Sequence, residues 1–261
     1  MMRRRQASSL MLAALAGTCL PAVAAAAADL PGIRARGELR IGTSGTAPPN
    51  TWVNSKDQLQ GYDIDWGDMI ARELQLPLKW VMVDFRGLMP ALSSGQLDMV
   101  ITGVRIRESL KRTFLFSEPY AYERMVAVVR VGDRSMQTLS DIRGRSVGVV
   151  AASFQEDTIR AMGGYRELLA MPSGSDVFLS LHTGHIDVAV VGLTAAVHYE
   201  NHRPGEIRIV RGGGGVNAQG IVMQKTAVEL KAAVDRLVAR CRADGTYLAL
   251  YRKNFGIDPP Q

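Results

Sequence analysis

Apolar and polar positions alternate along the chain in a pattern that predicts strands followed by helices. Short apolar strands are expected at residues 38–43, 78–84, 97–102, 125–131, 146–150 and 186–191. Helical spacing of apolar residues indicates helices over 64–74, 88–93, 155–162, 227–243 and 247–255, and a further apolar segment covers 177–181. The repeated order of strand, helix and strand predicts an α/β protein with parallel sheets. No internal sequence repeat is evident.

The composition is that of a globular chain, because 47% of the 261 residues are hydrophobic and 21% are charged. These values exclude a disordered chain, a collagen and a coiled-coil rod. The length allows one large domain or two modest ones. The two cysteines are too few for a disulfide framework and wrongly spaced for a zinc knuckle. We expect Cys241 to be a small core residue of a helix.

Residues 1–28 have the pattern of a secretory signal peptide. Three arginines at positions 3–5 precede a short apolar region at 10–20 and a run of alanines suited to cleavage. The apolar region is shorter than the ~20 residues that cross a bilayer. The three arginines account for half of the net charge of +6. Thr18 stands where a lipoprotein has Gly or Ala before the lipidated cysteine, so cleavage after alanine is favoured over lipid anchoring at Cys19.

Five short motifs follow one another in the remaining sequence. They are Gly61-Tyr62-Asp63, Phe85-Arg86-Gly87-Leu88, Gly95-Gln96-Leu97-Asp98, Phe116-Ser117-Glu118-Pro119-Tyr120 and Asp244-Gly245-Thr246-Tyr247. Each motif alone is weak evidence, since each occurs in ordinary turns. In this order and behind a signal peptide, they resemble the periplasmic polar amino acid-binding proteins of bacterial ABC importers, solute-binding protein family 3. The resemblance covers about residues 37–257.

The resemblance implies an α/β fold of two lobes, each a mostly parallel sheet flanked by helices, with a ligand cleft between the lobes. Lobe 1 is expected to comprise residues 30–120 and 220–261, and lobe 2 residues 125–210. Hinges are expected near 121–124 and 211–219. In open α/β sheets the ligand binds beyond the carboxyl ends of the strands, and two facing lobes close on it by hinge motion.

The resemblance also implies the function. The protein would be the periplasmic solute-binding component of an ABC importer, capturing a small polar or anionic ligand and passing it to an inner-membrane permease. We expect a monomer without catalysis, cofactor or metal. The ligand is expected to be an organic anion or an amino acid derivative.

The binding residues of the family fall on identifiable positions of this chain. Phe85 would stack on the ligand, and Thr102, Gly103 and Arg105 would form the hydrogen-bonding segment of the first lobe. In the second lobe, Ser153, Phe154 and Gln155 would open a helix whose N–H groups face the ligand. Trp52 would wall the cleft or pack behind it.

Several positions depart from the family pattern: Arg105 stands where members usually have Ser or Thr, Ala152-Ser153-Phe154 replaces a Gly-Thr-Thr turn, and both positions that hold the charged groups of the ligand differ. Leu110 stands where members carry the arginine that holds the ligand carboxylate, and Gly192 where they carry the aspartate that receives the ammonium. In one explanation Arg105 replaces the missing arginine and the ligand is an anion without an obligatory amino group. In the other, Glu156 or another carboxylate takes over and the ligand is a modified amino acid.

Other classes of function find less support. A dehydratase of this fold, acting on a cyclic carboxylic acid, would need a proton-donating carboxylate in the cleft, where Gly192 and Leu193 stand. His198 and His202 have a metal-compatible spacing but no evident third ligand, which favours a solvated helix face. Beyond residue 5 no basic cluster suggests nucleic-acid binding. The glycine-rich segment 211–215 lacks the Lys and Ser/Thr of a phosphate-binding loop, so we expect a flexible crossover.

Overall fold

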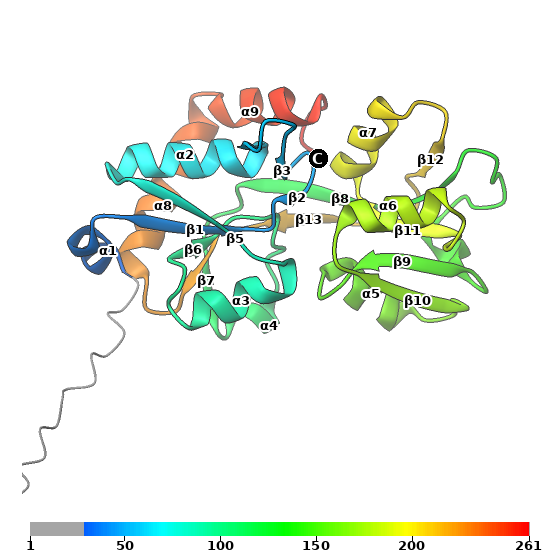
Figure 1. The fold of residues 1–261 in the computed structure, drawn as a ribbon, viewed down its shortest axis with the longest axis horizontal. Coiled ribbons are helices and arrows are strands. Elements are labelled where there is room, and N and C mark those ends of the chain that lie inside the picture. The colour runs from blue at the N-terminus through cyan, green and yellow to red at the C-terminus, as the bar shows by residue number, and fades with distance from the viewer. Residues whose placement is uncertain (1–28, 261) are drawn as a thin grey trace, which may run out of the picture.

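The computed structural model describes residues 29–260. The predicted signal peptide and Cys19 lie outside the described residues. Figure 1 shows two α/β lobes side by side, with strands that run from one lobe into the other. Within the described residues no helix has the length and apolar character needed to span a bilayer.

The first lobe is built on a five-stranded sheet. Its order is β5 (Leu78–Met82), β1 (Leu39–Thr43), β6 (Met99–Val100), β14 (Val222–Gln224) and β7 (Phe114–Phe116). β14 runs antiparallel to both neighbours, and the other strands share one direction. The helices of this lobe are α1 (Leu30–Arg36), α2 (Tyr62–Leu74), α3 (Phe85–Ser93), α4 (Glu108–Lys111), α8 (Val228–Ala243) and α9 (Thr246–Phe255).

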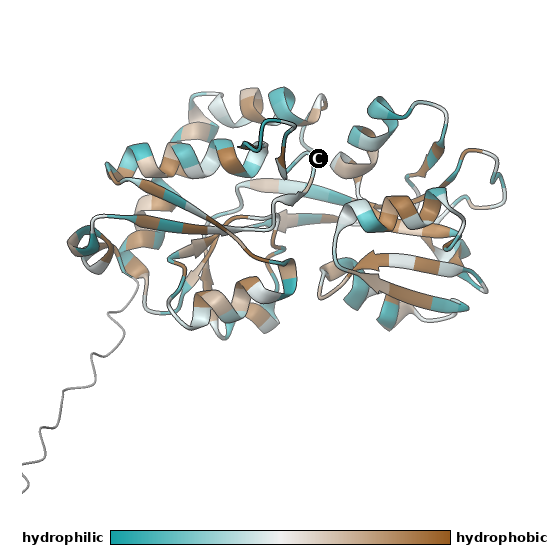
Figure 2. Cartoon of the chain, viewed as in Figure 1, coloured by the Kyte–Doolittle hydropathy of each residue, from teal (hydrophilic) through white to brown (hydrophobic). Residues whose placement is uncertain are grey.

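Both faces of this sheet are covered, as its apolar strands predicted. Trp66 of α2 and Val234 of α8 belong to the apolar cluster on one face, which also contains Ile41 of β1. Leu88 and Leu92 of α3 pack on the other face. Figure 2 shows the hydrophobic colour on many of the strand segments and alternating hydrophobic and hydrophilic bands along helices such as α2. Cys241 is buried in α8, as expected.

The second lobe repeats this arrangement with different elements. Its sheet has the order β10 (Glu167–Met171), β9 (Ser146–Val150), β11 (Val188–Gly192), β8 (Ala121–Arg130) and β12 (Ile207–Val210). Here β8 is the reversed strand. The 3₁₀ helix η1 (Leu139–Ile142) and α5 (Phe154–Met162) contribute to the cluster on one face, and α6 (Gly174–His182) and α7 (Leu193–His202) to the cluster on the other.

The two lobes also share a short motif that was not recognised in the sequence. Gly95–Asp98 and Gly184–Asp187 have the same pattern of glycine, polar, branched apolar and aspartate residues. The first aspartate accepts the backbone N–H of Arg40 at 2.8 Å, and the second accepts that of Ser146 at 2.9 Å. Each aspartate therefore ties its segment to the start of the neighbouring parallel strand. The motif is only four residues long, too short to stand out as an internal sequence repeat.

Two antiparallel strands connect the lobes. The first residues of β8 pair with β13 (Val216–Gln219), in register from Arg124 opposite Val216 to Ala121 opposite Gln219. These strands coincide with the segments where hinges are expected; motion about them stays a prediction. The glycines before β13 have less conformational freedom than expected for a flexible crossover. A Cβ on Gly214 would lie 1.6 Å from the Met125 carbonyl oxygen.

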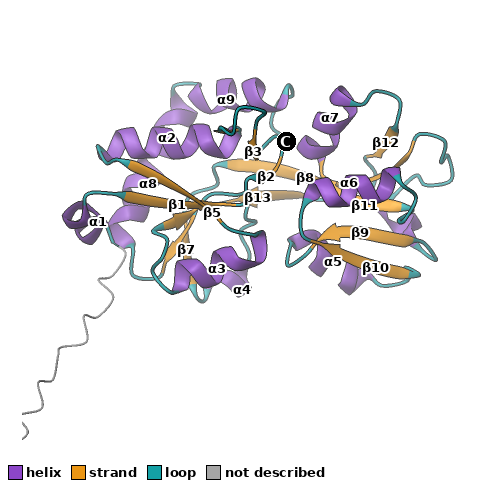
Figure 3. Ribbon diagram, in the orientation of Figure 1, coloured by secondary structure: helices purple, strands orange, loops and turns teal. Residues whose placement is uncertain are grey.

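The predicted elements differ from the structure mainly at short or exposed segments. The predicted strand 97–102 is ordered as a strand only in β6, and the segment 177–181 lies in α6. β10 was not predicted, nor was the small antiparallel sheet of β2 (Thr46–Ala47), β3 (Thr51–Val53) and β4 (Leu59–Gln60). Figure 3 shows the loops joining strand ends to helices where the two lobes face each other.

Candidate functional site

A cavity of about 360 Å³ lies between the lobes. Loops that follow β1 and β6 form its first-lobe wall, and loops that follow β9, β10 and β11 form its second-lobe wall. Glu123 and Gln219 of the connecting strands also line it. The position beyond the carboxyl ends of parallel strands is the one expected for a ligand in an open α/β sheet. The volume lies at the lower end of the range for small-molecule sites.

A smaller cavity of about 140 Å³ adjoins the first. The two share part of their walls: Ala47, Phe85, Thr102, Gly103, Glu123, Val150, Gln155 and Gln219. Arg105, Arg107, Ser153 and Phe154 line the smaller cavity only. Of the eight residues predicted for the site, all except Trp52 therefore lie in the wall of at least one cavity.

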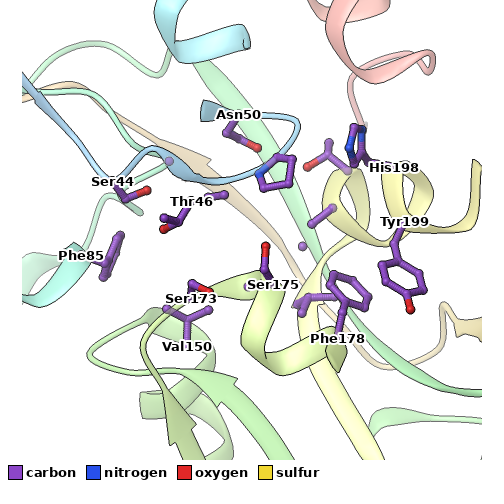
Figure 4. Close-up of a pocket in the computed structure, with 18 of the residues that line it drawn as sticks. Ser44, Thr46, Asn50, Phe85, Val150, Ser173, Ser175, Phe178, His198 and Tyr199 are labelled. Carbon is purple, nitrogen blue, oxygen red and sulfur yellow. The ribbon is translucent and has the colours of Figure 1, made fainter. Parts of the chain in front are cut away.

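Phe85 lies at the junction of the two cavities. It is the first residue of α3, because the apolar spacing that predicted a helix from residue 88 extends back to it. Figure 4 shows its ring on the first-lobe side of the cleft, facing Val150 and Ser173 of the second lobe. The ring is thus placed to contact a solute held between the lobes.

Thr102 and Gly103 follow β6, and hydrogen bonds to neighbouring residues hold them in place. The Thr102 hydroxyl donates to the Ser44 hydroxyl at 3.1 Å. The Gly103 N–H donates to the Tyr120 hydroxyl at 2.9 Å, and that hydroxyl donates to the Asp63 carboxylate at 2.8 Å. Burial raises the pKa of Asp63 to about 7. Tyr120 and Asp63, both from the recognised motifs, therefore fix the loop that carries the site.

In the second lobe, Ser153 caps α5. Its hydroxyl accepts the N–H of Glu156 at 3.1 Å, so the first turn of α5 begins at the cavity wall with Phe154 and Gln155. The Glu156 carboxylate is turned to its own helix, where it accepts the Ala152 N–H and pairs with Arg160 at 2.5 Å. Glu156 lines neither cavity, so it does not supply the carboxylate that one explanation required.

The two arginines after β6 reach across to α5. The guanidinium carbon of Arg105 lies 3.4 Å from the centroid of the Phe154 ring, and Arg107 pairs with Asp157. Burial, with a smaller contribution from Arg107, lowers the pKa of Arg105. A guanidinium stacked on a ring keeps donors along its edge. Arg105 can therefore contact Phe154 and an anion in the smaller cavity together.

Trp52 lies outside the walls of both cavities. It belongs to β3, and its ring centroid lies 5.7 Å from that of His198 on α7. Trp52 thus packs at the rim, where the lobes meet. His198 is half-buried and lines the larger cavity, so the expected solvated face is wrong for this residue. Among residues 29–260, no group of three potential ligands is placed to hold a metal.

The larger cavity extends away from Phe85 into an aromatic compartment between α6 and α7. The rings of Phe178 and Tyr199 stack there, with centroids 4.3 Å apart and planes inclined by 10°. Figure 4 shows these two rings side by side, with His198 above them. The compartment could accept an apolar or aromatic part of a solute.

Glu123 is the wall residue that the sequence analysis missed. It projects from β8, is 8% exposed, and borders both cavities. Its carboxylate accepts the Arg124 N–H at 3.0 Å, the Thr194 N–H at 3.3 Å and the Thr194 hydroxyl. Burial raises the pKa of Glu123 to about 7. Carboxylates are seldom buried unless they are paired, so the burial of Glu123 in the structure indicates a role.

The comparisons with known proteins agree with this architecture. The chain is 26% identical to the L-cystine-binding protein of Escherichia coli over 227 residues, covering 87% of this chain and 85% of the relative. It is 28% identical to the lysine/arginine/ornithine-binding periplasmic protein of Escherichia coli over 229 residues, covering 83% and 87%.

Among solved structures, an ancestral arginine-binding protein bound to glutamine matches with a TM-score of 0.80 and 32% identity, covering 85% of this chain and 99% of that one. The family model of the bacterial extracellular solute-binding proteins, family 3, matches residues 39–257. Because this match covers well over half of the 261 residues, the chain belongs to family 3 of the bacterial extracellular solute-binding proteins.

Proposed function

We propose that the protein captures an amino acid in the cleft and delivers it to the inner-membrane permease of an ABC importer from the periplasm. The observation that carries the proposal is the pair of adjoining cavities whose walls come from both lobes and from the strands between them. A solute held there contacts both lobes, so it binds the closed arrangement better than an open one. Such differential affinity is what drives closure.

The smaller cavity suits the polar end of an amino acid. Arg105 and the first N–H groups of α5, next to Ser153, offer donors to a carboxylate. The larger cavity, with the Phe178 and Tyr199 rings, suits the side chain. The named relatives bind cystine, or lysine, arginine and ornithine, which supports an amino acid over a simple organic anion.

A melting-temperature screen of the purified protein tests this proposal. The panel contains the common amino acids, cystine and ornithine, with dicarboxylates and aromatic acids as competing classes. A ligand present at 100 times its Kd adds ~2.7 kcal/mol of stability. For a chain of this size that corresponds to a rise of roughly 5–10 °C. We expect such a rise with at least one amino acid. A rise with acids alone, or with none of the panel, contradicts the proposal.

One observation favours a second candidate, a dehydratase acting on a cyclic carboxylic acid. Glu123 is a buried carboxyl in the cleft whose pKa is raised to about 7, in the range useful to a general acid. The relatives reported above are named as binding proteins, so binding without reaction is the favoured function. Mass spectrometry after incubation with a hydroxylated cyclohexadienyl carboxylic acid separates the two, because loss of the hydroxyl group as water would occur only with the enzyme.

A further inference from the structure

We infer that Glu123 is the cation-binding residue of the cleft and that the solute presents a primary ammonium group to it. The inference rests on the proposed function and adds the chemical class that the site selects. Among the residues of 29–260 that line the two cavities, Glu123 is the one with an acidic side chain. It borders both cavities, so its carboxylate can reach a group located at their junction.

Within the described part of the chain, no cationic side chain pairs with the carboxylate of Glu123. The groups that donate to it are the Arg124 N–H, the Thr194 N–H and the Thr194 hydroxyl, and the backbone of Leu193 also lowers its pKa; all of them are neutral. Because Glu123 borders both cavities, a cation in the cleft can approach it from the cavity side. A buried charge that is not paired is costly, and a bound cation would remove that cost.

The fold offsets part of the cost of a negative charge at this position. Gly192 is the N-cap of α7 and has no side chain to cap the helix, so Glu123 caps it from the neighbouring strand through Thr194. The positive end of the α7 dipole stabilises the ionised carboxylate. A Cβ on Gly192 would lie 2.8 Å from both the carboxyl carbon and Oε2 of Glu123. The glycine therefore leaves the space that the glutamate fills.

A role as a helix cap would also explain the hydrogen bonds from Thr194 to Glu123. The test must therefore separate the charge of the carboxylate from its ability to accept those hydrogen bonds. Glu123→Gln keeps a carbonyl oxygen for the N–H donors and removes the charge. Glu200→Gln makes the same change of charge on α7 outside both cavities and serves as the matched control. The probes are L-arginine, L-glutamine and L-phenylalanine. Each is paired with its deaminated counterpart: 5-guanidinopentanoic acid, glutaramic acid and 3-phenylpropionic acid.

Titration calorimetry gives the first readout. Wild-type protein should bind at least one of these amino acids about tenfold to a hundredfold more tightly than the deaminated counterpart, the range of one charge-assisted hydrogen bond. Glu123→Gln should remove that difference, and Glu200→Gln should keep it. Equal binding of a pair by the wild type, or an unchanged preference in Glu123→Gln, overturns the inference while leaving solute capture intact. Failure of the wild type to bind any amino acid instead defeats the proposed function.

Proton release gives the second readout, which a purely structural cap would not change. Because the pKa of Glu123 is about 7, a fraction of the carboxyls is protonated at neutral pH. An ammonium partner favours the ionised form, so binding should release protons and affinity should rise between pH 6 and 8. Heats measured in buffers of different ionisation enthalpy should reveal this release in the wild type and not in Glu123→Gln. Release of the same size in Glu123→Gln as in the wild type contradicts the assignment.

Other titratable groups near Glu123 need to be considered in that experiment. Arg124 on β8 donates to the Gly214 carbonyl at 3.2 Å, and Tyr251 on α9 donates to the Tyr122 carbonyl at 2.9 Å. Burial raises the pKa of Tyr251, so its hydroxyl does not titrate near neutral pH. His198 and Arg105 share the cavities with Glu123. Burial lowers the pKa of His198. Any change in the protonation of His198 on binding occurs in Glu123→Gln as well as in the wild type.

Discussion

Tyr120 illustrates how a residue outside the cavity can determine the shape of its wall. Its hydroxyl accepts the Gly103 N–H and donates to Asp63, so one oxygen joins the site loop to the start of α2. The Tyr62 hydroxyl donates to the Tyr120 carbonyl at 2.6 Å. The two motifs that contain these residues are therefore linked in the structure and support the site without touching the solute.

Tyr120→Phe should lower the free energy of unfolding by about 1–3 kcal/mol, because it leaves the Gly103 N–H and the buried Asp63 carboxylate short of a partner. Urea denaturation measures the change. Tyr247→Phe is the control, because the Tyr247 hydroxyl is buried without a hydrogen-bond partner. Equal losses in the two variants would show that the Tyr120 hydroxyl contributes nothing specific.

Arg105→Ala should weaken binding of an amino acid by about tenfold to a few hundredfold, since a charge-assisted hydrogen bond to the carboxylate is lost. Arg107→Ala should have a smaller effect, because Arg107 pairs with Asp157 of α5. Titration calorimetry of both variants with one amino acid checks the order. An unchanged affinity in Arg105→Ala would mean that the N–H groups of α5 alone hold the carboxylate of the amino acid.

Individual wall residues were predictable where the resemblance located them, in a motif for Phe85 and after a predicted strand for Thr102 and Gly103. Their contact with a ligand stays a prediction. Glu123 was not found, because its place in the cleft depends on the pairing of β8 with β11, which brings Gly192 opposite Met125. That register is a tertiary property, and the sequence around residue 123 does not specify it.

At the level of elements, the strands that connect the lobes are packed more tightly than their glycine content suggested. Leu139 donates its N–H to the Gly212 carbonyl at 2.9 Å, and Met125 donates to Gly215 at 3.2 Å. The glycines therefore permit close approach of backbone to backbone. Long helices such as α8 were predicted well because their apolar spacing is regular. β10, which was not predicted, is a half-exposed strand at the edge of its sheet.

A pair of glycine substitutions tests this packing. Gly214→Ala should destabilise the protein by about 2–4 kcal/mol, because its Cβ would clash with the Met125 carbonyl. Gly215→Ala should change the free energy of unfolding by less than about 0.5 kcal/mol, because nothing lies within 4 Å of its Cβ. Urea unfolding of the two variants measures both values. Tolerance of alanine at position 214 would show that this segment can shift away from β8.

At the scale of the whole molecule, side-chain contacts join the lobes around the cleft. Arg105 stacks on Phe154, Arg107 pairs with Asp157, and Trp52 meets His198. Together with the walls of the cavities, they describe an arrangement in which the lobes face each other across a site that is small enough to be filled by one solute. The resemblance predicted this two-lobed fold. The sequence did not predict the contacts across the cleft, because they join residues that are far apart in the chain.

A crystal structure with the amino acid that raises the melting temperature most would test the central claim directly. The ammonium nitrogen should lie within about 3.2 Å of the Glu123 carboxylate, and the carboxylate should face Arg105 and the start of α5. Residues of both lobes should contact the solute. An amino acid bound by one lobe alone, or bound with its ammonium directed away from Glu123, would contradict this account.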